Sequence, residues 1–83
     1  MESKNYLDVH TYTLDDAKRL IQKAIDLSYN NGFPSLKVIH GFNNGDKIKT
    51  WCLKSGKNLK HVIKVDSGEN EGITIFYIEL KLF

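Results

Sequence analysis

The sequence predicts an α/β fold, a two-layer sandwich in the order β-α-β-α-β-β with a mixed four-stranded sheet and both helices on one face. Two segments have the apolar spacing of amphipathic helices, and four shorter segments are rich in β-branched and aromatic residues. The helical segments separate the first three strands, so we expect those strands to run parallel through right-handed crossovers, which place both helices on the same side of the sheet. At 83 residues the chain is expected to form a single domain, residues 1–83.

An alternating strand and an amphipathic helix open the chain. Asn5–His10 places Leu7 and Val9 on one side, the period of a half-buried strand. Thr13 is predicted to be the N-cap of the following helix, and Gly32 its left-handed C-cap. The buried face of this helix is predicted to consist of Leu14, Ala17, Leu20, Ile21, Ala24, Leu27 and Ser28.

A second strand, a glycine-containing turn and a second helix follow. Leu36–His40 is predicted to be a buried strand and Gly41–Gly45 a tight turn. The buried stripe of the next helix is predicted to consist of Ile48, Trp51, Cys52 and Ser55. We expect Trp51 to be a core anchor, and Cys52 to be a small buried residue and not a nucleophile.

Two further strands complete the sheet. His61–Val65 is predicted to be a short strand, and Ile73–Leu80 is the longest strand pattern in the chain. The polar segment Asp66–Gly72 joins them. Its seven residues leave open whether the two strands pair antiparallel or are arranged differently.

Composition and charge narrow the class of protein. One cysteine excludes an internal disulfide and a cysteine-based zinc site, and no apolar run is long enough to span a membrane, so the cytoplasm is the default location. The spacing of potential ligand residues does not indicate a metal site. The sequence leaves open which cofactor is used, and a divalent metal ion is one of the options. The net charge is +2, but residues 35–64 carry seven lysines against Asp46 alone, a sum of +6. Such a segment favours nucleic acid, or else its lysines cover a solvated face.

Polar residues gather where the first two strands end. The carboxyl ends of parallel strands collect ligand-binding loops, so His10 and His40 should lie along the same edge. Asp8 is on the same side of its strand as His10 and could orient the imidazole. The amides of the turn Gly41–Gly45 and of the helix after it suit a phosphate. Together these groups supply acid–base chemistry for a phosphodiester; the alternative is two ordinary polar residues at strand ends.

Two motifs resemble those of the Smr (small MutS-related) domain family. Leu7–His10 is similar to the family's LDxH motif, and His40–Gly45 resembles its HGxGxG loop at the matching distance downstream. Thr74–Leu80 is similar to its closing strand, so the resemblance covers nearly the whole chain. Thr11 and Asn43 stand where the family more often has glycine. The resemblance implies the fold of the C-terminal domain of translation initiation factor three and nucleic-acid binding, with nicking of DNA or cleavage of RNA in some members.

Carried over residue by residue, the resemblance links Asp8 and His10 to catalysis. The nucleic-acid-binding set, completed by the neighbouring polar and basic residues, is expected to be His40, Gly41, Asn43, Asn44, Gly45, Lys47 and Lys49. Three function classes follow: an endonuclease acting on DNA or RNA, a nucleic-acid or ribosome-binding module without catalysis, and a protein-interaction domain that uses the uncovered face of the sheet.

Overall fold

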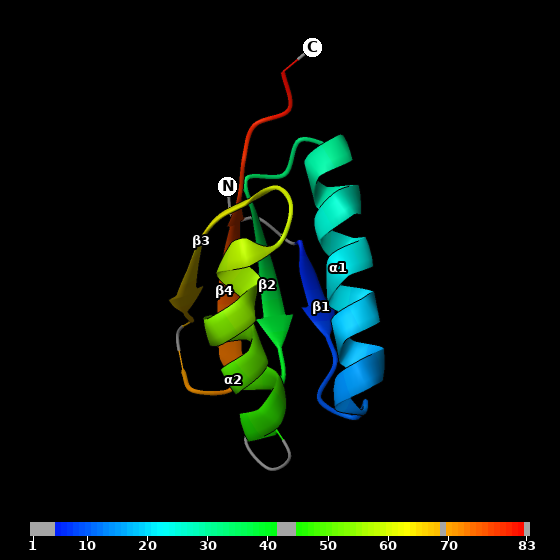
Figure 1. Ribbon diagram of the computed structural model, residues 1–83, viewed down its shortest axis with the longest axis vertical. Helices are drawn as coiled ribbons and strands as arrows, with labels where there is room; N and C mark the ends of the chain where they lie inside the picture. The colour runs from blue at the N-terminus through cyan, green and yellow to red at the C-terminus, as the bar shows by residue number, and fades with distance from the viewer. Residues whose placement is uncertain (1–4, 42–44, 69, 83) are drawn as a thin grey trace.

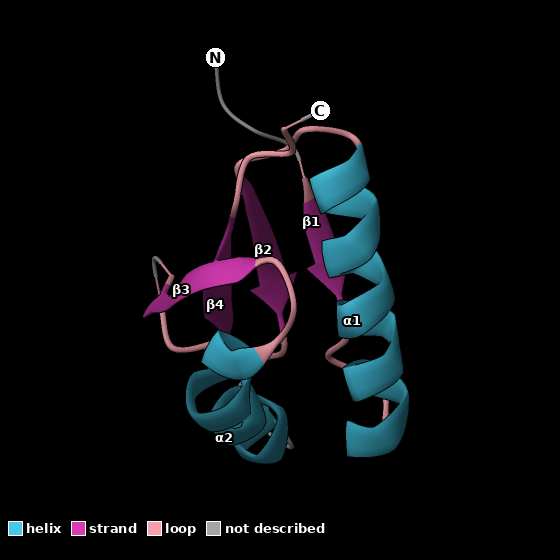
Figure 2. Ribbon diagram, turned by 45° about the horizontal axis from the view of Figure 1, so that its top comes forward, coloured by secondary structure: helices cyan, strands magenta, loops and turns pink. Residues whose placement is uncertain are grey.

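The predicted order of strands and helices is the one observed. The computed structural model describes residues 5–41, 45–68 and 70–82. Its elements are β1 (Tyr6–Asp8), α1 (Leu14–Asn30), β2 (Ser35–Ile39), α2 (Gly45–Ser55), a 3-10 turn (Gly56–Asn58), β3 (Val62–Ser67) and β4 (Ile73–Ile78). Figure 1 shows the four strands with α1 and α2 packed against the sheet, and Figure 2 shows the two helices on the same face. The two-layer sandwich is therefore confirmed.

The sheet has the order β1-β2-β4-β3. β1 pairs parallel with β2, whereas β4 pairs antiparallel with both β2 and β3. The first three strands thus share one direction, as predicted, but β4 lies between β2 and β3. The last two strands form an antiparallel pair, which settles the alternative that the sequence left open. As a result, the carboxyl ends of β1 and β2 and the first turns of both helices meet at one end of the molecule (Figure 1).

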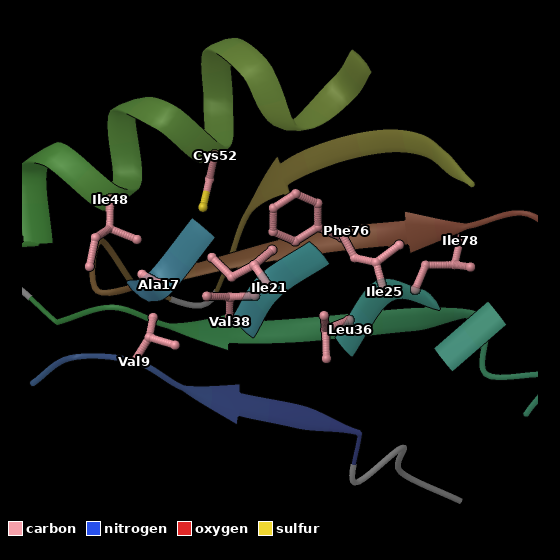
Figure 3. Close-up of a cluster of buried hydrophobic side chains, with 10 residues drawn as sticks. All are labelled: Val9, Ala17, Ile21, Ile25, Leu36, Val38, Ile48, Cys52, Phe76 and Ile78. Carbon is pink, nitrogen blue, oxygen red and sulfur yellow. The ribbon is translucent and has the colours of Figure 1, made fainter. Parts of the chain in front are cut away.

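The core lies between the sheet and the two helices (Figure 3). Its buried side chains come from both layers: Val9, Ala17, Ile21, Ile25, Leu36, Val38, Ile48, Cys52, Phe76 and Ile78. Phe76 is fully buried on β4, and its ring lies against Gly56 at the end of α2. A Cβ atom at Gly56 would come within 2.6 Å of Phe76 Cε1, so the absence of a side chain at residue 56 is what makes room for the largest core residue.

Helix α1 begins at the predicted N-cap, but its C-cap is Asn31 and not Gly32, and its buried stripe is shifted. The Thr13 hydroxyl accepts a hydrogen bond from the Asp16 N–H at 3.2 Å, and Gly32 has φ +77° just beyond the helix. Ile25 is buried, while Leu27 is 54% exposed, so the prediction of a buried Leu27 is wrong. Leu27 lies on the flank of α1 that faces β1, and β1 is a three-residue edge strand too short to cover it.

The four residues predicted for the buried stripe of α2 differ in burial: Ile48 and Cys52 are buried, whereas Trp51 and Ser55 are only partly buried. Cys52 is fully buried, and burial raises the pKa of its thiol to about 12, which confirms that it is a packing residue. Trp51 is only partly buried and packs against the edge of the core. The Lys18 ammonium lies over its ring, 5.9 Å from the centroid. Trp51 thus contacts the core with part of its side chain, while the rest of the side chain is accessible to solvent.

A cluster of Tyr29, His61 and Glu79 joins three segments at the end of the molecule opposite to the carboxyl ends of β1 and β2. His61 has φ +74°, its ring stacks on Tyr29 with centroids 3.6 Å apart, and its Nδ1 lies 2.7 Å from Glu79 Oε2. These contacts hold the start of β3 against the last turns of α1 and the chain just after β4. Of the helices described, none is both long and apolar enough to cross a bilayer.

Candidate nucleic-acid site

Asp8 and His10 form a hydrogen-bonded pair at the carboxyl end of β1. His10 Nδ1 lies 2.5 Å from Asp8 Oδ1, and the His10 backbone N–H donates to the same oxygen at 3.1 Å. This second bond turns the chain out of the strand, so β1 ends at Asp8 and not at His10 as predicted. Both side chains remain about half exposed, at 46% for Asp8 and 55% for His10.

The pair has the geometry of an oriented imidazole. Hydrogen bonds from the His10 ring, and then from its backbone N–H, hold the pKa of Asp8 below its ordinary value of 3.8. An ionised carboxylate only accepts hydrogen bonds, so Nδ1 carries the shared hydrogen and Nε2 is left for a ligand. The described residues offer Nε2 no hydrogen-bond partner. Asp8 therefore fixes both the direction and the tautomer of His10.

Gly41 leaves room for the His10 side chain because it has no side chain of its own. Gly41 has φ +77°, and a Cβ there would come within 3.2 Å of the His10 Cβ. Its N–H donates to the carbonyl of Gly72 at 3.1 Å, as the His40 N–H does at 2.9 Å. The Gly41 amide is thus already occupied and does not face a phosphate, which differs from the expectation that the turn's amides form the anion site. Gly72, which the sequence did not single out, anchors the start of the turn.

His40 lies inside the protein and not at the lip of the turn. Its side chain is 1% exposed, with Nε2 2.8 Å from the Thr74 hydroxyl and Nδ1 3.2 Å from the Gly41 carbonyl oxygen. The carbonyl only accepts, so Nδ1 is the donor and Thr74 donates to Nε2 of a neutral ring. Burial lowers the pKa of His40 below 6.5, and the nearby Lys49 ammonium acts in the same direction. Direct contact of this imidazole with nucleic acid would require it to leave the core.

The remaining predicted binding residues are dispersed. Asn43 and Asn44 lie outside the described residues, and Gly45 is the first residue of α2. Lys47 lines a cleft beside α1, whereas Lys49 points to the other side of α2 with its Nζ 3.9 Å from Glu71 Oε1. Residues two apart on a helix face different directions, and this separates the two lysines.

A cleft of about 650 Å³ opens between the first turns of α1 and α2. One wall is the segment Thr11–Asp15 and the other is Asp46, Lys47 and Ile48. Thr11 follows His10 in the chain and is the lining residue nearest in sequence to the Asp8–His10 pair, while Asp8 and His10 themselves do not line the cleft. Tyr12 is 48% exposed at this wall. Tyr12, which lies between Thr11 and the N-cap Thr13, was not among the predicted site residues, although three hydroxyl side chains directly before a helix indicate a polar surface.

The molecule is therefore a small α/β domain with a hydrogen-bonded histidine–carboxylate pair at the end of the edge strand β1. Residues 7–81 match the family model of the Smr domain, and the chain belongs to that family. The resemblance seen in the two sequence motifs is thereby confirmed.

Relatives and a solved structure agree with this assignment. The chain is 31% identical over 83 residues to "Endonuclease MutS2" of Aquifex aeolicus, with 95% of this chain and 11% of the relative covered. It is 36% identical over 73 residues to the protein of the same name from Caldanaerobacter subterraneus subsp. tengcongensis, covering 83% of this chain and 9% of the relative. The chain therefore spans only about a tenth of the length of these curated relatives.

The crystal structure of the Smr domain of Thermus thermophilus MutS2 superimposes with a TM-score of 0.83 at 16% identity. The match covers 90% of this chain and 98% of that one. At this identity the likeness concerns the fold.

Proposed function

We propose that this Smr domain binds nucleic acid and cleaves its phosphodiester bonds, with His10 as the general acid–base group. The observation that carries the proposal is the Asp8–His10 pair, in which an exposed imidazole is held by a carboxylate at 2.5 Å, one residue before the cleft wall that begins at Thr11. The name of the two MutS2 relatives, endonuclease, supports the same reaction class.

In the proposed reaction a water molecule attacks the phosphorus while His10 Nε2 accepts its proton. The phosphorus–oxygen bond to the leaving group breaks, and the leaving oxygen is protonated by the imidazolium or by solvent. Asp8 stabilises the imidazolium charge and keeps Nε2 directed outward. Within the described part of the chain, no group of three His, Cys, Asp or Glu residues is arranged to hold a metal ion.

The test is cleavage of labelled single-stranded and duplex DNA and RNA, with and without EDTA. General acid–base groups contribute about 10²–10⁴-fold, so His10→Ala should lower cleavage by roughly that factor while leaving unfolding unchanged. Asp8→Asn should give an intermediate loss, because the imidazole remains but loses its orienting charge. His61→Asn is the matched control: it removes the other histidine–carboxylate pair, at the opposite end, and asparagine tolerates the positive φ.

Binding is tested separately by its salt dependence. The logarithm of affinity should fall by about 0.7–0.9 per neutralised phosphate for each unit in log salt concentration. Lys47→Glu should weaken binding more than Lys49→Glu, because Lys47 lines the cleft and Lys49 faces Glu71.

Three results would overturn parts of this proposal. Cleavage by His10→Ala at the wild-type rate would remove the catalytic assignment. Binding without cleavage of any substrate would make the domain a nucleic-acid or ribosome-binding module, as the second function class describes. Binding that is independent of salt would contradict the electrostatic argument itself.

A further inference from the structure

A second hollow continues the cleft along α2 beside the first turn of α1, and we call it the Trp51 groove. It has a volume of about 420 Å³ and shares Leu14, Asp46 and Lys47 with the cleft beside His10, so the two form one continuous path. Its further lining comes from α2 alone and includes Thr50, Trp51 and Lys54. The volume lies within the ~300–1,000 Å³ of typical ligand sites.

Trp51 contributes an aromatic side chain to the lining of the Trp51 groove. Trp51 packs against the core with one part of its side chain and lines the groove with the rest. Lys18 of α1 holds its ammonium 5.9 Å from the ring centroid. An aromatic face bordered by cations can stack with a nucleobase while the cations attract the adjacent phosphates.

The charges around the Trp51 groove favour an anionic ligand. Lys47 and Lys54 line it and Lys18 lies near its tryptophan, against the single carboxylate of Asp46 in its lining. Among the described residues, none of these three lysines forms an ion pair with the protein. A phosphate would therefore gain their attraction without first having to break an ion pair.

From this geometry we propose that the Trp51 groove binds an unpaired base of a single-stranded nucleic acid, stacked on Trp51, with flanking phosphates on Lys47 and Lys54. The inference rests on the nucleic-acid binding proposed above and specifies its substrate class. Trp51 is partly buried in the protein, and in a duplex the bases are stacked within the double helix. Only an unpaired base can therefore reach the indole ring. The shared residues direct the next nucleotides of that strand along the cleft toward Tyr12 and Thr11, the residue that follows His10.

Trp51 is the only tryptophan in the chain and is therefore its own reporter. Short single-stranded oligonucleotides, dT10 and rU10, should quench its emission on binding, and a blunt-ended duplex of two fully complementary strands at equal phosphate concentration should not. Fluorescence anisotropy of labelled oligonucleotides gives the affinity independently. Poly-glutamate is the control for a purely anionic ligand without bases.

Variants separate stacking from folding. Trp51→Leu should weaken single-strand affinity about 5- to 150-fold, on the scale of one lost base stack. Its thermal unfolding is measured as well, because Trp51 also touches the core. Lys54→Glu leaves the core untouched and should weaken binding more than the matched control Lys60→Glu, which makes the same charge change away from the Trp51 groove.

The outcomes distinguish this inference from the function on which it rests. If single strands bind by anisotropy while Trp51 emission is unchanged and Lys54→Glu equals Lys60→Glu, the Trp51 groove is not the binding path, although the domain still binds nucleic acid. Equal quenching by the duplex or by poly-glutamate would also overturn the stacking of an unpaired base. If no nucleic acid binds at all, both proposals fail.

Discussion

Gly41 and Gly32 form a natural pair for testing whether the position of His10 matters. Both glycines have φ +77°, but nothing lies within 4 Å of a Cβ built at Gly32, whereas a Cβ at Gly41 meets the His10 Cβ at 3.2 Å. Alanine at either position incurs the same left-handed backbone strain, about 1–2 kcal/mol. Only alanine at Gly41 also pushes against His10.

The expected effects combine these two terms. For a domain of this size, 1 kcal/mol shifts the melting temperature by about 4–8 °C, so Gly32→Ala should lower it by about 4–16 °C and leave cleavage by the folded protein unchanged. Gly41→Ala should lose at least as much stability. A neighbour at 3.2 Å must give by a few tenths of an ångström. Since a 1 Å misplacement can cost about 10²-fold in rate, we expect up to roughly ten-fold slower cleavage.

Both variants are to be compared by urea unfolding and by cleavage below the unfolding transition. Equal losses of activity in Gly32→Ala and Gly41→Ala would mean that backbone strain alone is responsible. Full activity in a folded Gly41→Ala protein would show that the contact with His10 does not position the imidazole, and the reasoning would be refuted.

Three further predictions concern stability. His40 is held neutral by burial, so its contribution is fully present above its ordinary pKa of 6.5 and is lost as pH falls through its lower folded-state value; His40→Gln should flatten the stability profile between pH 7 and 5, and an unchanged slope would contradict this. Gly56→Ala should cost about 1–3 kcal/mol through overpacking, because the new Cβ meets the buried ring of Phe76 at 2.6 Å; a double variant with Phe76→Leu should recover part of the loss, and a neutral Gly56→Ala would show that the ring can move. Thr13→Ala should cost about 1 kcal/mol in urea unfolding through loss of the bond to the Asp16 N–H, while Thr13→Ser should retain most of it; equal losses would exclude the cap.

Much of this protein is determined by its sequence because the signals involved are local. The alternation around Leu7 and Val9, the cap at Thr13 and the glycine at residue 32 each depend on residues close by in the chain. The Asp8–His10 contact is equally local, since two side chains two residues apart at a strand end can reach each other through a turn. These features could be predicted before any tertiary structure was known.

The rest was decided by contacts between segments distant in the chain. β4 enters between β2 and β3, and this places Thr74 beside His40 and Gly72 beside Gly41. From the sequence alone, a histidine at the end of a strand is predicted to be accessible, because the strand that covers it is not known. In the same way, an amide in a glycine turn is predicted to be free, because its acceptor is not known. The Trp51 groove likewise exists only because α1 and α2 pack side by side with their first turns at the same end. Periodicity determines which residues face inward on one element, whereas the partner of each polar group is determined by the packing of elements far apart in the sequence.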